Sequence, residues 1–441
     1  MNTSKKSPVE KWITNPLHSF ISNTTTGGIV LFASAILALI FANSSFSNFY
    51  HSFWEYKFGF IINDQFYLNQ SLIHWVNDGL MALFFFVIGL ELKREIIGGE
   101  LSNPKKAILP IAAAFGGMLF PAIIYVFFNN SGPAFSGWGI PMATDIAFAL
   151  GVLYVLGDKV LNSLKIFVTV LAIADDLGAV LVIAFFYTSE ISFLNLAVGL
   201  SFLIMLIFAN KMGVRNTAFY GIVGLGGVWL FFLMSGVHAT IAAVLLAFTI
   251  PANVRVKEST YIKKMTSLLD IFKKSDPNNN PILTSEQLQL LEEMRSLTKS
   301  AMTPLQRLEN GLHPIVTFII MPVFAFANAG ITFSNHLYDD ATSAIALGVF
   351  FGLLIGKFLG IVGVSSLLIH LKLANLPENM NQRHLFGVGF LAAIGFTMSL
   401  FVSSLAFDDK TYILGAKIGT FAASLLGGIL GYLILNKKRQ Y

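Results

Sequence analysis

The sequence contains no cysteine, which excludes disulfide bonds, zinc–thiolate sites and cysteine-ligated iron–sulfur clusters. Charged residues are also scarce: they make up 12% of the 441 residues, whereas 55% are hydrophobic. Soluble domains contain about 25% charged residues. So little charge, interspersed between long apolar runs, predicts a chain whose main partner is a lipid bilayer.

What is present is a series of about twelve apolar stretches, each long enough to cross a bilayer as a helix of roughly 20 residues. The sequence lacks the alternating ten-residue pattern of an outer-membrane barrel. We therefore expect an all-α polytopic membrane protein of about twelve transmembrane helices. The expected spans are 27–43, 78–97, 107–128, 141–157, 165–187, 193–210, 217–234, 237–252, 312–333, 343–370, 385–406 and 412–435.

The distribution of basic residues predicts the orientation. Of the 29 lysines and arginines, all but Lys57, Lys357, Lys410 and Lys417 fall on one side of these spans. By the positive-inside rule that side is cytoplasmic, together with both termini. The net charge of +5 therefore reflects topology and predicts no nucleic-acid partner. We expect a cytoplasmic N-terminus at 1–26, a transmembrane domain at 27–436 and a cytoplasmic tail at 437–441.

Two segments of the 27–436 domain are expected outside the membrane. Residues 53–69 alternate apolar and polar side chains around an Asn-Asp turn, which indicates either a plain loop or an outer hairpin. Such a hairpin offers an edge for pairing with a second subunit in a homodimer. The cytoplasmic segment 253–311 contains SDPNNNP, a predicted break between two helices, and TSEQ, a predicted helix N-cap. We expect a solvated connector there.

Two spans carry signals for a broken helix. The fourth opens with WGIPMATDIAF, and the eleventh reads GVGFLAAIGFTMSLF. Interrupted helices are tolerated at membrane depth where neighbouring protein or a water-filled cavity satisfies the freed backbone groups. The two spans occupy corresponding triplets, 3 to 5 and 10 to 12, which points to a transport site. The alternative is that glycine only permits close helix packing.

The stretch LAIADDLGAV places two adjacent carboxylates, Asp175 and Asp176, inside an apolar span. A charge at the bilayer centre costs at least about 2.5 to 3.5 kcal/mol, and neither acid has a basic i,i+4 partner in its own span. Desolvation and mutual repulsion make such a pair hold protons until a cation replaces them. Carboxylates, the Thr144 hydroxyl and carbonyls of an unwound helix are the oxygen ligands that a hard alkali cation requires.

Two further charges lie within spans. Asp145 follows Thr144 one turn into the fourth span, and Lys357 is the only basic residue well inside the membrane. We expect Lys357 to be the counter-charge to an aspartate across the bundle. A snorkelling lysine is the alternative, although the long apolar flanks of Lys357 disfavour it.

Charges at the span ends are less specific. GLELKREIIGGE places Glu91, Arg94 and Glu95 on adjoining helical faces, and LENGLHP supplies Glu309. His238 lies in SGVHAT at the outer end of the eighth span. Solvated helix-end charges, and a helix-end hydrogen bond for His238, are the alternatives to a functional role.

At these residues the sequence resembles the NhaA family of sodium/proton antiporters. The motifs that carry the resemblance span nearly the whole chain and read WVNDGLMALFFFVIGLELKRE, ATDIAFALGVL, LAIADDLGA, SGVHAT, FAFANAG, GLLIGK and IGFTMSLF. The resemblance implies inverted repeats with two broken, crossing helices. It also implies that Asp175 and Asp176 bind the cation and protons, that Thr144 and Asp145 belong to the crossing, and that Lys357 faces the site.

Further implications concern function. By resemblance the chain exports Na⁺ or Li⁺ in exchange for H⁺, electrogenically and under pH regulation, in a bacterial inner membrane. Asp176 would be the indispensable cation ligand, while Asp175 contributes to the proton count or pairs with Lys357. Cation access or pH response falls to Asp78, Glu91, Arg94, Glu95, Glu309 and His238. The ions are transported substrates, and no cofactor is expected.

Two other classes of membrane protein are alternatives to an antiporter. A sodium-coupled solute symporter could use the same inverted repeat, but it would require an organic solute for cation flux. Intramembrane aspartyl proteases also keep two aspartates in adjacent spans, but they carry a GxGD motif, and no aspartate follows a GxG here. We therefore expect a transporter and not an enzyme.

Overall fold

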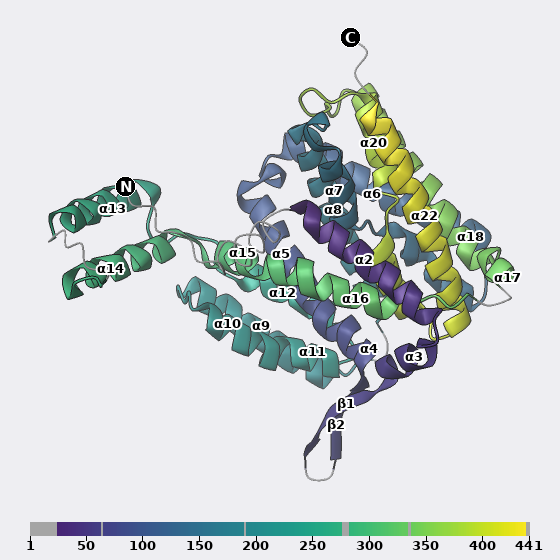
Figure 1. The fold of residues 1–441 in the computed structure, drawn as a ribbon, viewed down its shortest axis with the longest axis horizontal. Coiled ribbons are helices and arrows are strands. Elements are labelled where there is room, and N and C mark those ends of the chain that lie inside the picture. The colour runs from purple at the N-terminus through teal and green to yellow at the C-terminus, as the bar shows by residue number, and fades with distance from the viewer. Residues whose placement is uncertain (1–23, 63–64, 189–190, 276–281, 334–336, 438–441) are drawn as a thin grey trace.

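The computed structural model describes residues 24–62, 65–188, 191–275, 282–333 and 337–437, and these are almost entirely helical (Figure 1). The helices of the main bundle are α2 (Thr24–Ala42), α5 (Met81–Gly98), α6 (Pro104–Phe128), α7 (Ile146–Val155), α8 (Asn162–Phe186), α9 (Phe193–Lys211), α10 (Thr217–Val223), α11 (Leu230–Met234), α12 (Ala239–Thr249), α15 (Pro304–Ile315), α16 (Met321–Asn328), α18 (Ala344–Phe351), α19 (Lys357–His370), α20 (Gln382–Leu391), α21 (Phe396–Ala406) and α22 (Lys410–Asn436). The predicted all-α class is confirmed.

The membrane-spanning pattern agrees with the prediction. Within the described ranges, eight helices are long and apolar enough to cross a membrane, and ten when two bent pairs each count as one span. The bent pairs are α2 with α3 (Ser47–Glu55), at 112°, and α20 with α21, at 45°. Two more expected spans correspond to α5, whose second half is charged, and to the short apolar helix α12.

The two predicted extramembrane segments have regular structure. Strands β1 (Lys57–Ile62) and β2 (Gln65–Ser71) form an antiparallel hairpin that projects from one end of the bundle (Figure 1). It begins later than residue 53 because 53–55 complete helix α3. The predicted Asn-Asp turn lies outside the described residues.

Segment 253–311, expected to be cytoplasmic, contains two helices that lie side by side next to the bundle, α13 (Glu258–Lys274) and α14 (Ser285–Ala301) (Figure 1). The predicted N-cap is present: the Thr284 hydroxyl accepts from Gln287 N–H, and the Gln287 side chain bonds back. A second capping box, of Thr303 and Gln306, starts α15 at Pro304. The helix that enters the ninth span therefore begins earlier than the predicted residue 312.

Small residues set the closest helix contact in the bundle. Helices α6 and α19 meet at Gly116 and Gly360, where a Cβ on either glycine would overlap the backbone carbonyl of the other. This contact fixes α19 directly against α6 and thereby positions Lys357, one turn before Gly360. A π-helical turn, η8 (Gly352–Gly356), joins α18 to α19 and ends immediately before Lys357. Such turns are frequent at functional sites.

Candidate functional site

The two predicted helix breaks lie against each other. The fourth span consists of a 3₁₀ segment, η4 (Pro133–Met142), three extended residues and then α7. The eleventh is interrupted between α20 and α21. Asp145 N–H donates to the Ile394 carbonyl at 2.6 Å, and the Thr144 hydroxyl donates to the Ala392 carbonyl at 3.1 Å. Backbone groups freed by one break are therefore satisfied by the other.

Asp145 joins the N-termini of α7 and α21. One carboxylate oxygen caps α7 by accepting from Phe148 N–H at 3.1 Å. The other accepts from Thr397 N–H at 3.0 Å and from the Thr397 hydroxyl at 2.5 Å. A negative charge here compensates the positive ends of two helices at once. Asp145 is thus fully engaged in the crossing, with Thr397 as its partner.

Asp175 and Asp176 occur in the middle of α8, and both side chains are completely buried. Lys357, from α19, is also completely buried and forms an ion pair with Asp175 Oδ2. The Lys357 ammonium additionally donates to the carbonyl of Met142, at the C-terminal end of η4. The cation therefore compensates both a carboxylate and a negative helix end.

Asp176 has a different environment from its neighbour. Both Asp176 oxygens are buried with no hydrogen-bond partner among the described residues, and so is Asp175 Oδ1. Asp175, Asp145, Lys357 and Glu91 all lie within electrostatic range of Asp176. Thr144 lies within interaction range of the Asp175 carboxyl. The site thus presents unpartnered carboxylate oxygens beside an unwound backbone, the kind of oxygen donor that binds a proton or a hard cation.

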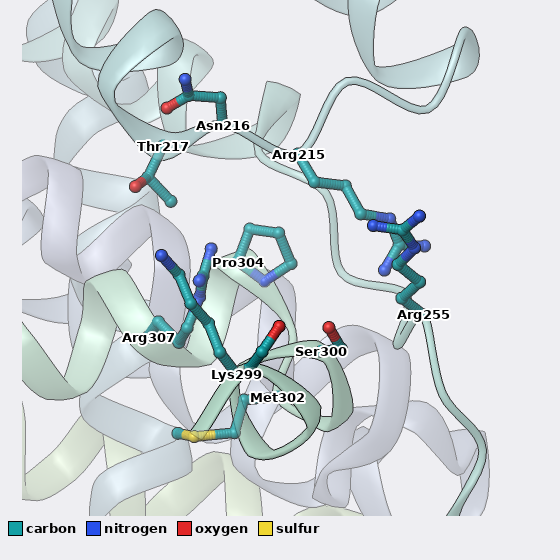
Figure 2. Close-up of a pocket in the computed structure, with 10 residues that line it drawn as sticks. Arg215, Asn216, Thr217, Arg255, Lys299, Ser300, Met302, Pro304 and Arg307 are labelled. Atoms are coloured by element: carbon teal, nitrogen blue, oxygen red, sulfur yellow. The ribbon is translucent and has the colours of Figure 1, made fainter. Parts of the chain in front are cut away.

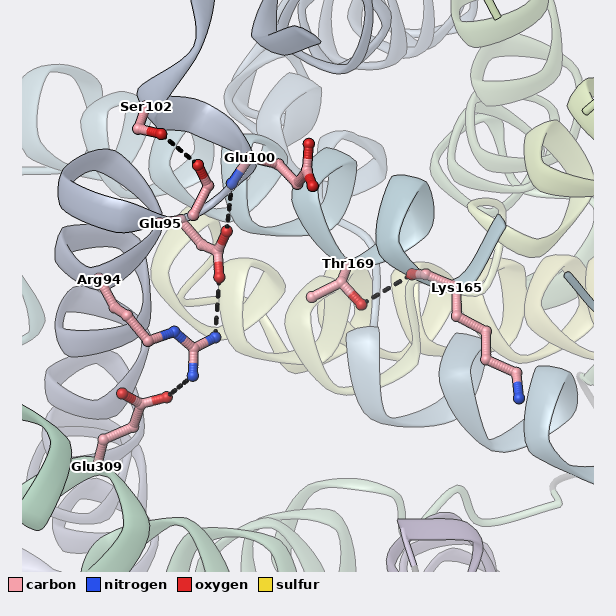
Figure 3. A network of polar contacts seen from close by, with 8 residues as sticks. Arg94, Glu95, Glu100, Ser102, Lys165, Thr169 and Glu309 are labelled. Atoms are coloured by element: carbon pink, nitrogen blue, oxygen red, sulfur yellow. Dashed lines mark hydrogen bonds and ion pairs between the residues drawn. The ribbon is translucent and has the colours of Figure 1, made fainter. Parts of the chain in front are cut away.

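The charges predicted at the cytoplasmic mouth form one cluster (Figure 3). Arg94 pairs with Glu309 through Nη1 and with Glu95 through Nη2, the latter at 2.9 Å. Glu95 also accepts from Glu100 N–H at 3.1 Å. Glu91 lies within electrostatic range of Arg94 and Glu309. Helices α5 and α15 are therefore linked by charge at this end.

Asp78 and His238 do not join this cluster. Asp78 occupies a π-helical turn, η2 (Trp75–Leu80), at the opposite end of α5, where it forms an ion pair with His74 at 2.9 Å. Through that hydrogen bond Asp78 raises the pKa of His74, against the lowering effect of burial. His238 Nε2 lies 2.8 Å from the carbonyl oxygen of Tyr187, which is the helix-end hydrogen bond weighed above.

Some buried polar partners had no distinctive sequence signal. Thr397 is one such residue. Tyr187 is a second: its hydroxyl donates to the Ser136 carbonyl at 2.6 Å and accepts from Gly139 N–H at 3.1 Å. A buried amide pair, Asn328 to Asn77 at 2.9 Å, links α16 to η2. Asn77 and Asn328 lie in the motifs WVNDGLMALFFFVIGLELKRE and FAFANAG. A polar residue next to or within an apolar run is a signal by which they could have been identified.

No three His, Asp or Glu side chains in the described part of the chain gather where they could hold a metal ion together. The oxygen donors that do lie together are those of the aspartate pair, the Thr144 hydroxyl and the Met142 carbonyl at the neighbouring break. Such a mixed set suits a cation that enters and leaves.

Comparison with known proteins gives consistent results. The family model described as Na⁺/H⁺ antiporter 1 matches residues 18–435. The chain is 46% identical over 430 residues to the Na⁺/H⁺ antiporter NhaA of Oleidesulfovibrio alaskensis, covering 97% of this chain and 95% of that protein. It is 47% identical over 425 residues to NhaA of Acidithiobacillus ferrooxidans, covering 96% and 97%. The chain therefore belongs to the NhaA family of Na⁺/H⁺ antiporters.

Proposed function

We propose that this chain is a secondary active antiporter that exports Na⁺ or Li⁺ in exchange for H⁺. The observation that carries the proposal is the burial of Asp176 with both oxygens unpartnered. A buried carboxylate without partners is strongly unfavourable. A proton or a dehydrated cation relieves that cost, and both use the same oxygens, so the arrival of one displaces the other.

The pairing of Asp175 with Lys357 supports an electrogenic cycle. Protonation of Asp175 weakens its ion pair, and cation binding at Asp176 favours an ionised Asp175 nearby. Both carboxylates then take up protons in one half-cycle and share one Na⁺ in the other. More than one proton moves per sodium ion, and net charge crosses the membrane.

The remaining predicted residues have supporting roles in this proposal. Thr144 contributes an oxygen to the cation, and Asp145 holds the crossing in place. Glu91, Glu95 and Glu309, arranged around Arg94, take part in cation access from the cytoplasm or in the response to pH. Asp78 and His238 act at the outer end, where they influence access from that side.

The relatives favour exchange over sodium-coupled symport, since both are named as Na⁺/H⁺ antiporters. Transport of this kind involves no covalent chemistry, so the proposed protein is not an enzyme and its ions are substrates rather than cofactors. A symporter of the same fold would instead show Na⁺ flux that depends on an added organic solute.

We propose a bacterial inner membrane location with both termini in the cytoplasm. Support comes from the basic residues, which border the spans on one side. The domain limits are those expected above: 1–26, 27–436 and 437–441. In the segment expected at 53–69, strands β1 and β2 pair with each other in a two-stranded sheet whose outer edges favour a homodimer formed by strand addition.

The test uses purified protein in liposomes that contain a pH-sensitive dye. Addition of NaCl or LiCl should move protons without any organic solute, and an imposed voltage should change the rate. Asp176→Asn keeps the side-chain shape but cannot ionise, so it should abolish both exchange and calorimetric Na⁺ binding. Asp175→Asn should retain weak exchange with fewer protons per cation.

Asp270→Asn, at an exposed position on α13, is the matched control and should behave as wild type. Sodium affinity of the wild type should fall as pH decreases, because protons compete for the same oxygens. Full Na⁺ binding by Asp176→Asn, or a Na⁺ affinity that does not change with pH, would show that the exchange site is not the aspartate pair.

A further inference from the structure

A cavity of about 390 Å³ lies between the membrane bundle and the α13–α14 hairpin (Figure 2). It is separate from the aspartate pair. Its walls come from the α9–α10 connection, the segment that follows α12, the end of α14 and the start of α15. The lining residues are Arg215, Asn216, Thr217, Arg255, Ser296, Lys299, Ser300, Met302, Pro304 and Arg307.

The cavity concentrates positive charge. Four of the ten lining residues are basic and none is acidic. Figure 2 shows Arg215 and Arg255 on one side and Lys299 and Arg307 on the other. None of the four forms an ion pair with another described residue. Four cations that face a common space repel one another unless an anion lies between them.

Arg307 is the most informative of the four. Its Nε is buried and has no hydrogen-bond partner among the described residues. Leaving a buried charged donor unsatisfied is unfavourable, so we expect a hydrogen-bond acceptor from a ligand beside Arg307 Nε. By contrast Arg94, a short distance away on α5, is paired with two carboxylates.

Hydrogen bonds of Arg215 and of the backbone at Arg255 connect the walls of the cavity. The Arg215 guanidinium donates to the carbonyls of Asn253, at 2.7 Å, and Val254, at 3.4 Å. The backbone N–H groups of Arg255 and Val256 both donate to the Ser300 carbonyl, at 3.1 and 3.2 Å. These bonds tie three segments that are distant in sequence around one space, so a ligand meets a preorganised site.

We propose that this cavity binds a soluble phosphate-bearing anion. Guanidinium groups match phosphate geometry, and the hydroxyls of Thr217, Ser296 and Ser300 supply further donors. Only Met302 and Pro304 among the lining residues are apolar, so the cavity offers no wall for an acyl chain. This favours inorganic phosphate or a small phosphate ester over a lipid headgroup.

The experiment measures binding of inorganic phosphate to the full-length protein in detergent, by calorimetry at constant ionic strength. The wild type should bind phosphate, and Arg255→Gln/Lys299→Gln should bind roughly tenfold more weakly or worse, because charge-assisted hydrogen bonds are lost. Arg255→Lys keeps the positive charge but lacks the planar guanidinium group, so its phosphate affinity should lie between those of the wild type and the double variant. The double variant should retain Na⁺/H⁺ exchange in liposomes, which shows that it is folded.

Lys263→Gln/Lys264→Gln removes the same charge from an exposed face of α13 and is the control; it should bind phosphate as the wild type does. Equal weakening in this control, or no phosphate binding by the wild type, would overturn the proposal. A second arm repeats the titration in nanodiscs of phosphatidylcholine with and without phosphatidylglycerol. If the anionic lipid displaces phosphate, the occupant is a lipid headgroup and the soluble-anion proposal fails.

Discussion

Asp175 and Asp176 are adjacent in sequence but differ by about 100° around α8. That rotation directs Asp175 to Lys357, whereas Asp176 keeps both oxygens without a partner. Two identical side chains therefore acquire different chemistry from their surroundings alone. In the proposed exchange cycle, Asp175 takes up its proton against the ion pair with Lys357, and the unpartnered oxygens of Asp176 hold the proton or the cation.

The ion pair of Lys357 gives a stability prediction. Lys357→Ala leaves the buried Asp175 without its cation and should lower the free energy of unfolding by about 3 kcal/mol or more. The loss should be largest at alkaline pH, because protonation of Asp175 then does least to neutralise the unpaired carboxylate. Lys357→Ala/Asp175→Asn removes both charges and should recover much of that loss. Chemical unfolding in detergent measures both. Equal stability of the single and double variants would show that the pair is not coupled.

His74 and Asp78 give a pH prediction. Asp78 raises the pKa of His74 above its usual 6.5 in the folded protein. The pair therefore stabilises the fold fully below the unfolded pKa, and the stabilisation disappears as pH rises through the raised folded value. Asp78→Asn should lower the melting temperature at pH 6 and have little effect at pH 9. A difference that grows with pH would contradict this sign, and Asp270→Asn again serves as the control.

At the scale of elements, the contact of α6 with α19 determines where Lys357 lies. Gly360→Ala places a methyl group against the Gly116 carbonyl, which cannot move without shifting α6. We expect a loss of roughly 1 to 3 kcal/mol and impaired exchange, although Gly360 touches no ion. Melting curves and liposome assays measure the two effects.

Gly363 provides the comparison on the same helix. A Cβ at Gly363 would meet nothing within 4 Å. Gly363→Ala should therefore leave exchange unchanged and stabilise α19 slightly through helix propensity. Similar behaviour of the two alanine variants would mean that helix propensity, and not the close approach, dominates at Gly360.

At the scale of the whole molecule, much of the fold could be predicted, because long apolar runs and basic borders follow directly from bilayer physics. The helix breaks were also predictable from glycine, proline and the Thr-Asp pair. The pairing of side chains was only partly predictable: a pair of Asp175 with Lys357 was one of two expected roles for Asp175, and nothing in the sequence indicates that Thr397 contacts Asp145. These choices depend on helix rotation, which a π-helical turn before Lys357 alters.

The helical hairpin of α13 and α14 gives a prediction about the whole chain. Val256 and Ser300 are joined by a backbone hydrogen bond, so the two ends of the segment between them are adjacent in space. Replacement of 258–298 by a short Gly-Ser linker should leave Na⁺/H⁺ exchange within about twofold of the intact chain, since no bundle hydrogen bonds are cut. Liposome assays measure it. Complete loss of exchange in folded protein would show that the hairpin takes part in transport.

The hydrogen bonds between the two broken spans also constrain motion. Asp145 to Thr397, Asp145 to Ile394 and Ser399 to Ile140 fasten one break to the other by several short bonds. Sliding α7 past α21 would sever them together in a buried, poorly hydrated place. We therefore expect the crossing to move as a rigid body during alternating access, with the hinges in segments outside it.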